Sequence, residues 1–119
     1  MIIQPITNVT FGYSSPVKTL FKKGKLPLKY GFYGDIITKK TVTIEHLLPV
    51  SQGGKTTLDN VVLASANKNQ ERGTRPLEEM LNLEYVGRYL EQFRDVTVQG
   101  FNGNEYIQMI LNTIKKLIQ

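Results

Sequence analysis

The sequence predicts an α+β fold in which a short antiparallel β-hairpin is followed by a short helix and then by two longer amphipathic helices. Two runs of strand-forming residues, at 41–44 and 61–64, lie on either side of a loop that contains Gly53 and Gly54. After residue 75, apolar side chains recur at helical spacing. The length of 119 residues fits one domain, so we expect residues 1–119 to fold as a single unit.

The predicted hairpin and its helix form a motif core at about residues 41–73. The first strand has a β-branched residue at every position, and the second strand opens after Asn60. A helix over 66–72 should follow, because Ser65 is a suitable N-cap and Gly73 is a suitable residue to end it.

Two supporting helices are predicted over about 76–94 and 104–118, with a short strand at 96–98 between them. Pro76 suits a first helical turn, and Asn104 suits an N-cap. We interpret the apolar stripes of the two helices as core, with a partner-binding groove as the alternative. The stripes comprise Leu77, Met80, Leu81, Tyr85, Tyr89, Leu90 and Phe93 in the first helix, and Ile107, Ile110, Leu111, Ile114 and Ile118 in the second.

Positive charge is concentrated in the first part of the chain. Residues 1–75 contain 11 Lys or Arg against 4 Asp or Glu, whereas residues 76–119 contain 4 against 6. Such a basic half is typical of nucleic-acid binders, although a lysine-rich surface that only aids solubility fits equally well.

The segment 17–34 alternates lysines with leucines and aromatic residues, after an irregular stretch at 1–16. It is either an arm that contacts phosphates or a solvated loop whose apolar residues pin it to the core. We favour nucleic-acid contact for its lysines and for two lysines of the motif core. The lysines assigned to nucleic-acid binding are Lys22, Lys23, Lys25, Lys29, Lys55 and Lys68.

Composition excludes several classes of site. The chain has no cysteine, which rules out disulfides and thiolate-bound zinc, so no structural zinc is expected. It begins without the basic and apolar segments of a secretory signal and has no apolar run of membrane-spanning length. We therefore expect a cytoplasmic protein with no membrane partner.

The residues that can carry chemistry gather in the motif core. His46, the only histidine, follows Glu45 directly at the end of the first strand. Glu45 and Asn69 offer hard oxygen ligands for one Mg²⁺ or Mn²⁺, and His46 can take a proton from water near neutral pH. Asn60 should hydrogen-bond across the loop and fix its shape. Asn67, on the same short helix, is an alternative to Asn69.

The motif core contains the segments EHLLPVSQGG, DN and NKNQERG. Over about residues 30–76 they resemble the HNH endonucleases, whose shared element is the ββα-metal (His-Me finger) fold. By position, the resemblance implies that Glu45 and Asn69 are metal ligands and that His46 is the general base. It also implies that Asn60 orients the motif and that Arg72 contacts a phosphate.

Two features depart from the family pattern. Many HNH proteins carry CxxC pairs that bind a structural zinc, but here the corresponding places near 32–35 and at Ser65 and Lys68 lack cysteine, so packing must replace that metal. Glu45 also stands where Asp is common. The size and the basic lead-in look most like small phage or prophage members, which act in the cytoplasm of a bacterial host.

The resemblance implies an endonuclease that hydrolyses phosphodiester bonds in double-stranded DNA with one Mg²⁺ or Mn²⁺. The main alternative is a catalytically silent nucleic-acid-binding module on the same fold. A protein–protein module that uses the two C-terminal helices is a third hypothesis. No residue pattern indicates the oligomeric state or a preferred DNA sequence.

Overall fold

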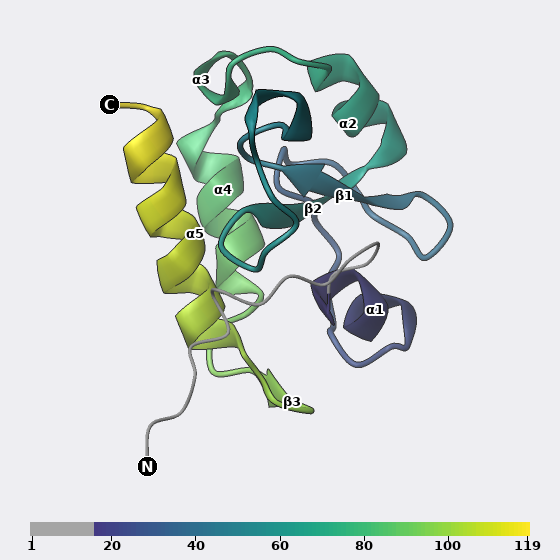
Figure 1. The fold of residues 1–119 in the computed structure, drawn as a ribbon. Helices are drawn as coiled ribbons and strands as arrows, with labels where there is room; N and C mark the ends of the chain where they lie inside the picture. Colours follow the sequence, from purple (N-terminus) through teal and green to yellow (C-terminus); the bar gives the residue numbers. More distant parts are fainter. Residues whose placement is uncertain (1–15) are drawn as a thin grey trace.

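The structure is a computed structural model, and it describes residues 16–119. The irregular stretch predicted at 1–16 therefore lies outside the described residues, apart from Pro16. Figure 1 shows a short hairpin at the centre, with α2 on one side of it and α4 and α5 on the other. The elements are α1 (Pro16–Lys22), β1 (Val42–His46), the 3-10 turn η2 (Val50–Gln52), β2 (Val61–Ser65), α2 (Ala66–Arg72), α3 (Leu77–Met80), α4 (Leu83–Glu91), β3 (Thr97–Val98), β4 (Phe101–Asn102) and α5 (Gly103–Leu117).

The predicted hairpin and the helix after it are present. Strands β1 and β2 pair antiparallel, from Val42 opposite Ser65 to His46 opposite Val61. Strand β1 ends with Glu45 and His46, as predicted. Helix α2 has the predicted bounds, since the Ser65 Oγ caps it by accepting from the Lys68 N–H at 3.3 Å. The mixed α and β architecture is therefore confirmed, and the motif core has the expected order.

The outer edge of β2 is closed by side chains rather than by a third strand. All five residues of β2 are buried. The Tyr89 hydroxyl accepts from the Leu63 N–H at 3.1 Å, and the Tyr106 hydroxyl donates to the Val61 carbonyl at 2.8 Å. The backbone N–H of Phe32 donates to the Leu63 carbonyl at 2.9 Å. Because α4 and α5 supply these hydroxyls, a two-stranded sheet can lie in the core without unpaired backbone groups at these positions.

The segment 17–34 proves to be partly helical and firmly packed. Its apolar residues are buried, as the pinned-loop interpretation expected, and α1 presents Val17, Leu20 and Phe21 to the core. Phe32 packs edge-to-face on Tyr33 and on Tyr89, with ring centroids 5.2 and 5.8 Å apart. The lysines of this segment that were assigned to nucleic acid, Lys22, Lys23, Lys25 and Lys29, are all exposed.

The prediction of a single helix over 76–94 was wrong, because this part of the chain forms two helices, α3 and α4. Leu81 has an extended backbone, and the Asn82 side chain accepts from the Tyr85 N–H at 3.1 Å to cap α4. Asparagine competes for backbone donors in this way and so favours a helix start over a helix interior. Tyr85, which was predicted to lie in the core, is instead exposed, with an exposed fraction of 37%.

The final helix starts earlier than predicted. The N-cap of α5 is Asn102, which accepts from the Glu105 N–H at 3.0 Å, whereas Asn104 bonds Asp95 instead. The buried stripe also differs from the predicted one, because Tyr106 and Met109 are buried whereas Leu111 and Ile118 are exposed. The strand expected at 96–98 is the two-residue β3, which pairs with β4. No helix within residues 16–119 is long and apolar enough to span a bilayer.

Candidate active site

Asn69 fastens helix α2 to strand β1. Its Nδ2 donates to the Thr43 Oγ1 at 3.0 Å and to the Ile44 carbonyl at 2.9 Å. Both amide hydrogens are thereby used, and no described residue donates to the remaining atom, the Oδ1. Thr43 and Glu45 are two residues apart on β1, so their side chains share one face of the strand. The Asn69 amide and the Glu45 carboxylate therefore belong to the same strand–helix interface.

Glu45 is buried and already has two polar neighbours. The Tyr33 hydroxyl donates to its Oε2 at 2.5 Å, and the Arg72 Nη1 lies 3.5 Å from the same oxygen. The Oε1 lies outside both contacts. Burial raises the pKa of Glu45, while the hydrogen bond from Tyr33 and the charge of Arg72 act in the opposite direction. The carboxylate is thus held in one orientation at the end of β1.

The Arg72 side chain is buried and hydrogen-bonds the backbone of the chain instead of facing solvent. Its exposed fraction is 1%. Its Nη1 and Nη2 donate to the His46 and Leu47 carbonyls, both at 2.8 Å, and its Nε donates to the Arg75 carbonyl at 3.0 Å. The resemblance implied a phosphate contact, but here the guanidinium donors are taken up by the chain. Arg72 therefore holds the end of β1, including the backbone of the predicted general base.

His46 projects from the last position of β1 and is half-buried. Its Nε2 lies 2.8 Å from the Thr56 Oγ1, in the loop between the strands. Burial lowers the pKa of His46, which favours the neutral imidazole at neutral pH. A neutral ring can accept a proton, and the Thr56 hydroxyl helps to fix its orientation. Nothing in the sequence pattern singled out Thr56.

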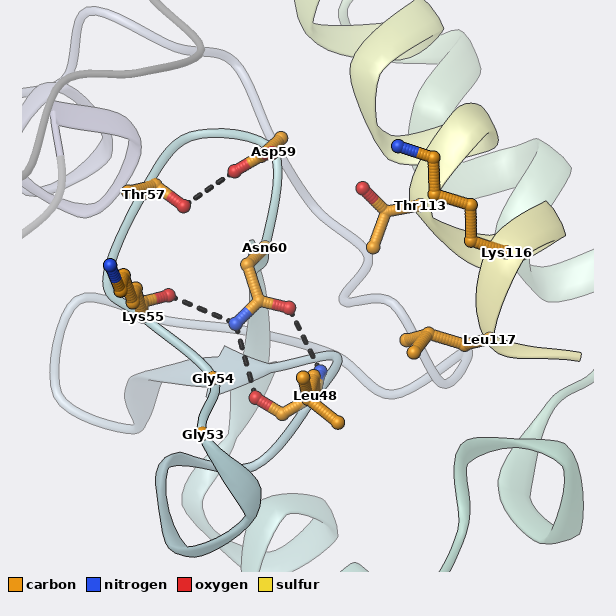
Figure 2. Close-up of a pocket in the computed structure, with 10 residues that line it drawn as sticks. All are labelled: Leu48, Gly53, Gly54, Lys55, Thr57, Asp59, Asn60, Thr113, Lys116 and Leu117. Carbon is orange, nitrogen blue, oxygen red and sulfur yellow. Dashed lines mark hydrogen bonds between the residues drawn. The ribbon is translucent and has the colours of Figure 1, made fainter.

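Asn60 ties the loop together, as Figure 2 shows. Its Oδ1 accepts from the Leu48 N–H at 2.8 Å, and its Nδ2 donates to the carbonyls of Leu48 and Lys55 at 3.1 and 2.9 Å. Gly54 permits this closure, because a Cβ there would lie 1.7 Å from the Leu48 carbonyl oxygen. These contacts are the ones expected of a residue that sets the shape of the loop after His46.

The oxygen donors at the interface fit a hard divalent cation held by few protein ligands. Among residues 16–119 there is no cluster of three or more His, Cys, Asp or Glu side chains. The Asn69 Oδ1 and the Glu45 carboxylate are nevertheless the neutral and anionic oxygens that Mg²⁺ and Mn²⁺ accept, with water completing the shell. Asn67, the alternative to Asn69, is exposed, whereas Asn69 is anchored on β1.

A direct hydrogen bond links two of the places that, by the resemblance, correspond to cysteines of a structural zinc site. The Ser65 N–H donates to the Asp35 Oδ2 at 2.5 Å. The Asp35 Oδ1 is buried and has no hydrogen-bond partner in the described part of the chain. This polar link supplements the packing that was expected to replace zinc.

The predicted nucleic-acid lysines of the motif core differ in their surroundings. Lys55 is exposed in the loop next to Thr56. Lys68 is only partly exposed, and its amine forms an ion pair with Glu71 at 3.3 Å. Thr56 was missed as a site residue, and so was Tyr33, which sequence reasoning treated as core packing. Its aromatic character predicted burial correctly but carried no sign of the bond to Glu45.

Comparison with known proteins finds one family match, which covers part of the chain. Residues 33–76 match the family described as HNH endonuclease. No curated protein and no solved structure matches the chain. The matched segment begins at Tyr33, ends just before α3, and contains Glu45, His46, Asn60 and Asn69. This segment, 44 of the 119 residues, therefore resembles the HNH endonuclease family.

Proposed function

We propose that this protein is an endonuclease that hydrolyses phosphodiester bonds in double-stranded DNA, with β1, β2 and α2 as a ββα-metal element. The observation that carries the proposal is the interface between β1 and α2. Three side chains with the required chemistry, Glu45, His46 and Asn69, stand on these two elements within the segment that matches the family. We infer that residues 1–119 work as one nuclease domain.

His46 is the proposed general base. The ring is neutral at working pH because burial lowers its pKa, and it would take a proton from the attacking water. Two contacts keep it in place, since Thr56 meets the ring and Arg72 holds the backbone carbonyl. Asn60 supports the same geometry from the loop side by pinning Leu48.

Glu45 and Asn69 are the proposed ligands of one Mg²⁺ or Mn²⁺. Such an ion, when bound, stabilises charge on the phosphate and on the leaving oxygen. The chain contributes the orientation of both ligands. Tyr33 and Arg72 restrain the carboxylate through its Oε2, and the strand backbone restrains the amide through its Nδ2.

The lysines supply the proposed contact with DNA. Lys22, Lys23, Lys25, Lys29 and Lys55 are exposed and come from the basic part of the chain. Cationic side chains of this kind bind phosphates without regard to base sequence and release counterions as they do so. Affinity should therefore fall steeply with salt.

A plasmid assay tests the proposal. Purified protein should convert supercoiled plasmid to relaxed or linear DNA in Mg²⁺ or Mn²⁺ and should do nothing in EDTA. His46→Ala should lose cleavage by at least about a hundredfold, which is the typical contribution of a general base, while it still binds DNA. Full cleavage by His46→Ala would sink the mechanism.

The catalytically silent module is kept as a second candidate because of one observation. Glu45 is buried and bound by Tyr33 and Arg72, which is an arrangement that a purely structural carboxylate would also have. Salt-sensitive DNA binding with no cleavage under any divalent metal would favour that candidate over the enzyme.

A further inference from the structure

A pocket of about 290 Å³ lies between the loop 53–60 and the last turns of α5. Helix α5 lies outside the segment that matches the HNH family, so the family match assigns it no part in the site. Figure 2 shows Lys55 and Lys116 at opposite sides of this pocket, with Thr113 beside Lys116 on the helix. The pocket thus lies between the loop after His46 and a helix whose apolar stripe was interpreted mainly as core.

The wall of the pocket is also the wall of the active site. Lys55 and Thr57 line the pocket, whereas Thr56 between them contacts the His46 ring at 2.8 Å. Within residues 55–57, Lys55 and Thr57 therefore line the pocket, and Thr56 contacts His46. The pocket is therefore lined by the same loop that contacts the proposed general base.

The chemistry of the pocket suits an anion. Lys55 and Lys116 are exposed cations, and Thr113 offers a hydroxyl. The carboxylate of Asp59 also lines the pocket, and its Oδ1 accepts from the Thr57 hydroxyl at 2.5 Å. An anion should therefore sit between the two lysines and away from Asp59. The volume is at the low end of the range for ligand sites, which suits a sugar-phosphate unit better than a base pair.

We propose that this pocket is a subsite for a backbone phosphate of duplex DNA next to the cleaved one, with Lys116 of α5 as its second cation. The inference rests on the proposed nuclease function and deepens it. Phosphate contacts of this kind fix the register of a protein on the duplex without reading sequence. Lys116 then holds the DNA strand in position, while His46 acts on the cleaved phosphate from the other side of residues 55–57.

The test compares two adjacent lysines. Lys115 and Lys116 both lie in the last turn of α5 and are both exposed, but of the two it is Lys116 that lines the pocket. Lys116→Ala and Lys115→Ala therefore remove the same charge from the same part of the helix. Binding of a fluorescein-labelled DNA duplex is measured by anisotropy in EDTA over a series of salt concentrations, after thermal melts confirm that both variants are folded.

Lys116→Ala should bind duplex about fivefold more weakly and lose about one unit of the salt slope, as expected for one phosphate contact. Lys115→Ala should stay within about twofold of wild type. Asp59→Asn should bind more tightly, because it removes a carboxylate from the lining of the pocket and keeps an oxygen that can accept from Thr57.

The outcomes distinguish failure of the subsite from failure of the proposed function. Equal behaviour of Lys116→Ala and Lys115→Ala, in a protein that binds and cuts DNA, would overturn the subsite alone. Absence of duplex binding by the wild-type protein even at low salt would overturn the subsite together with the proposed function. Weaker binding by Asp59→Asn would also count against a phosphate in the pocket.

Discussion

Tyr33→Phe is the sharpest probe of how the site is built. The substitution deletes one hydroxyl and keeps the ring that packs edge-to-face on Phe32 at 5.2 Å. The lost hydroxyl donates to the buried Glu45 Oε2 at 2.5 Å. Hydrogen bonds to ionised groups contribute about 1.5–3 kcal/mol, so we expect the free energy of unfolding to fall by about 2 kcal/mol near pH 7.

The loss of unfolding free energy in Tyr33→Phe should be larger at neutral pH than in acid. Burial raises the pKa of Glu45 and the bond from Tyr33 lowers it, so this bond stabilises the ionised carboxylate. Because the net shift is upward, the folded state binds the proton more tightly than the unfolded chain, and stability falls as pH rises through the pKa of Glu45. Without the Tyr33 hydroxyl the pKa of Glu45 should rise further, so the total fall in stability is larger. The difference between variant and wild type should therefore be largest at neutral pH and shrink once Glu45 is protonated.

Urea unfolding at about pH 7 and at about pH 4 measures both quantities. Tyr30→Phe is the matched control, because its hydroxyl has no hydrogen bond within residues 16–119 and its ring lies under Arg88 at 4.2 Å. The control should change stability by less than about 0.5 kcal/mol at either pH. If Tyr33→Phe behaves like Tyr30→Phe at neutral pH, or if its penalty persists unchanged in acid, then the Tyr33 hydroxyl does not stabilise an ionised Glu45 in the folded protein.

Two further predictions concern the loop and the base. Gly54→Ala should destabilise the protein by about 3 kcal/mol, because its Cβ would lie 1.7 Å from the Leu48 carbonyl oxygen. Gly87→Ala, where a Cβ meets nothing within 4 Å on α4, should be neutral or stabilise by up to about 1 kcal/mol, and thermal melts that rank the two variants the other way would contradict the structure. Burial lowers the pKa of His46, so the acid limb of kcat/KM for plasmid nicking should lie below the ordinary histidine pKa of about 6.5, and a limb above that value would exclude a neutral buried base.

Local chemistry explains why the motif core was predictable. The bounds of α2 follow from Ser65 and Gly73, which act within one turn of the helix ends. The pairing of β1 with β2 follows from two short strand-forming runs joined by a loop. Each of these features depends on neighbours in sequence, so one sequence is enough to find them.

The parts that escaped prediction depend on distant partners. A basic residue near a nuclease motif reads naturally as a phosphate contact, yet Arg72 is buried because Tyr33 and Glu45 stand beside it. The helical period of apolar residues runs across the break, from Leu81 to Tyr85, so periodicity alone could not reveal that the Asn82 side chain starts a new helix. Long-range contacts and capping decided both cases against the local pattern.

These distant contacts also explain how the motif can stand without zinc. A hairpin and a seven-residue helix cannot bury enough apolar surface to be stable alone, and isolated helices of that length are marginal in water. Here Tyr89 and Tyr106 close the outer edge of β2, and Asp35 bonds the start of α2 at Ser65. Arg72 closes the other end of α2 onto β1. The contacts from α4 and α5 hold β2, and those of Asp35 and Arg72 hold the two ends of α2, so together they fix the elements that carry the candidate site residues without a structural metal.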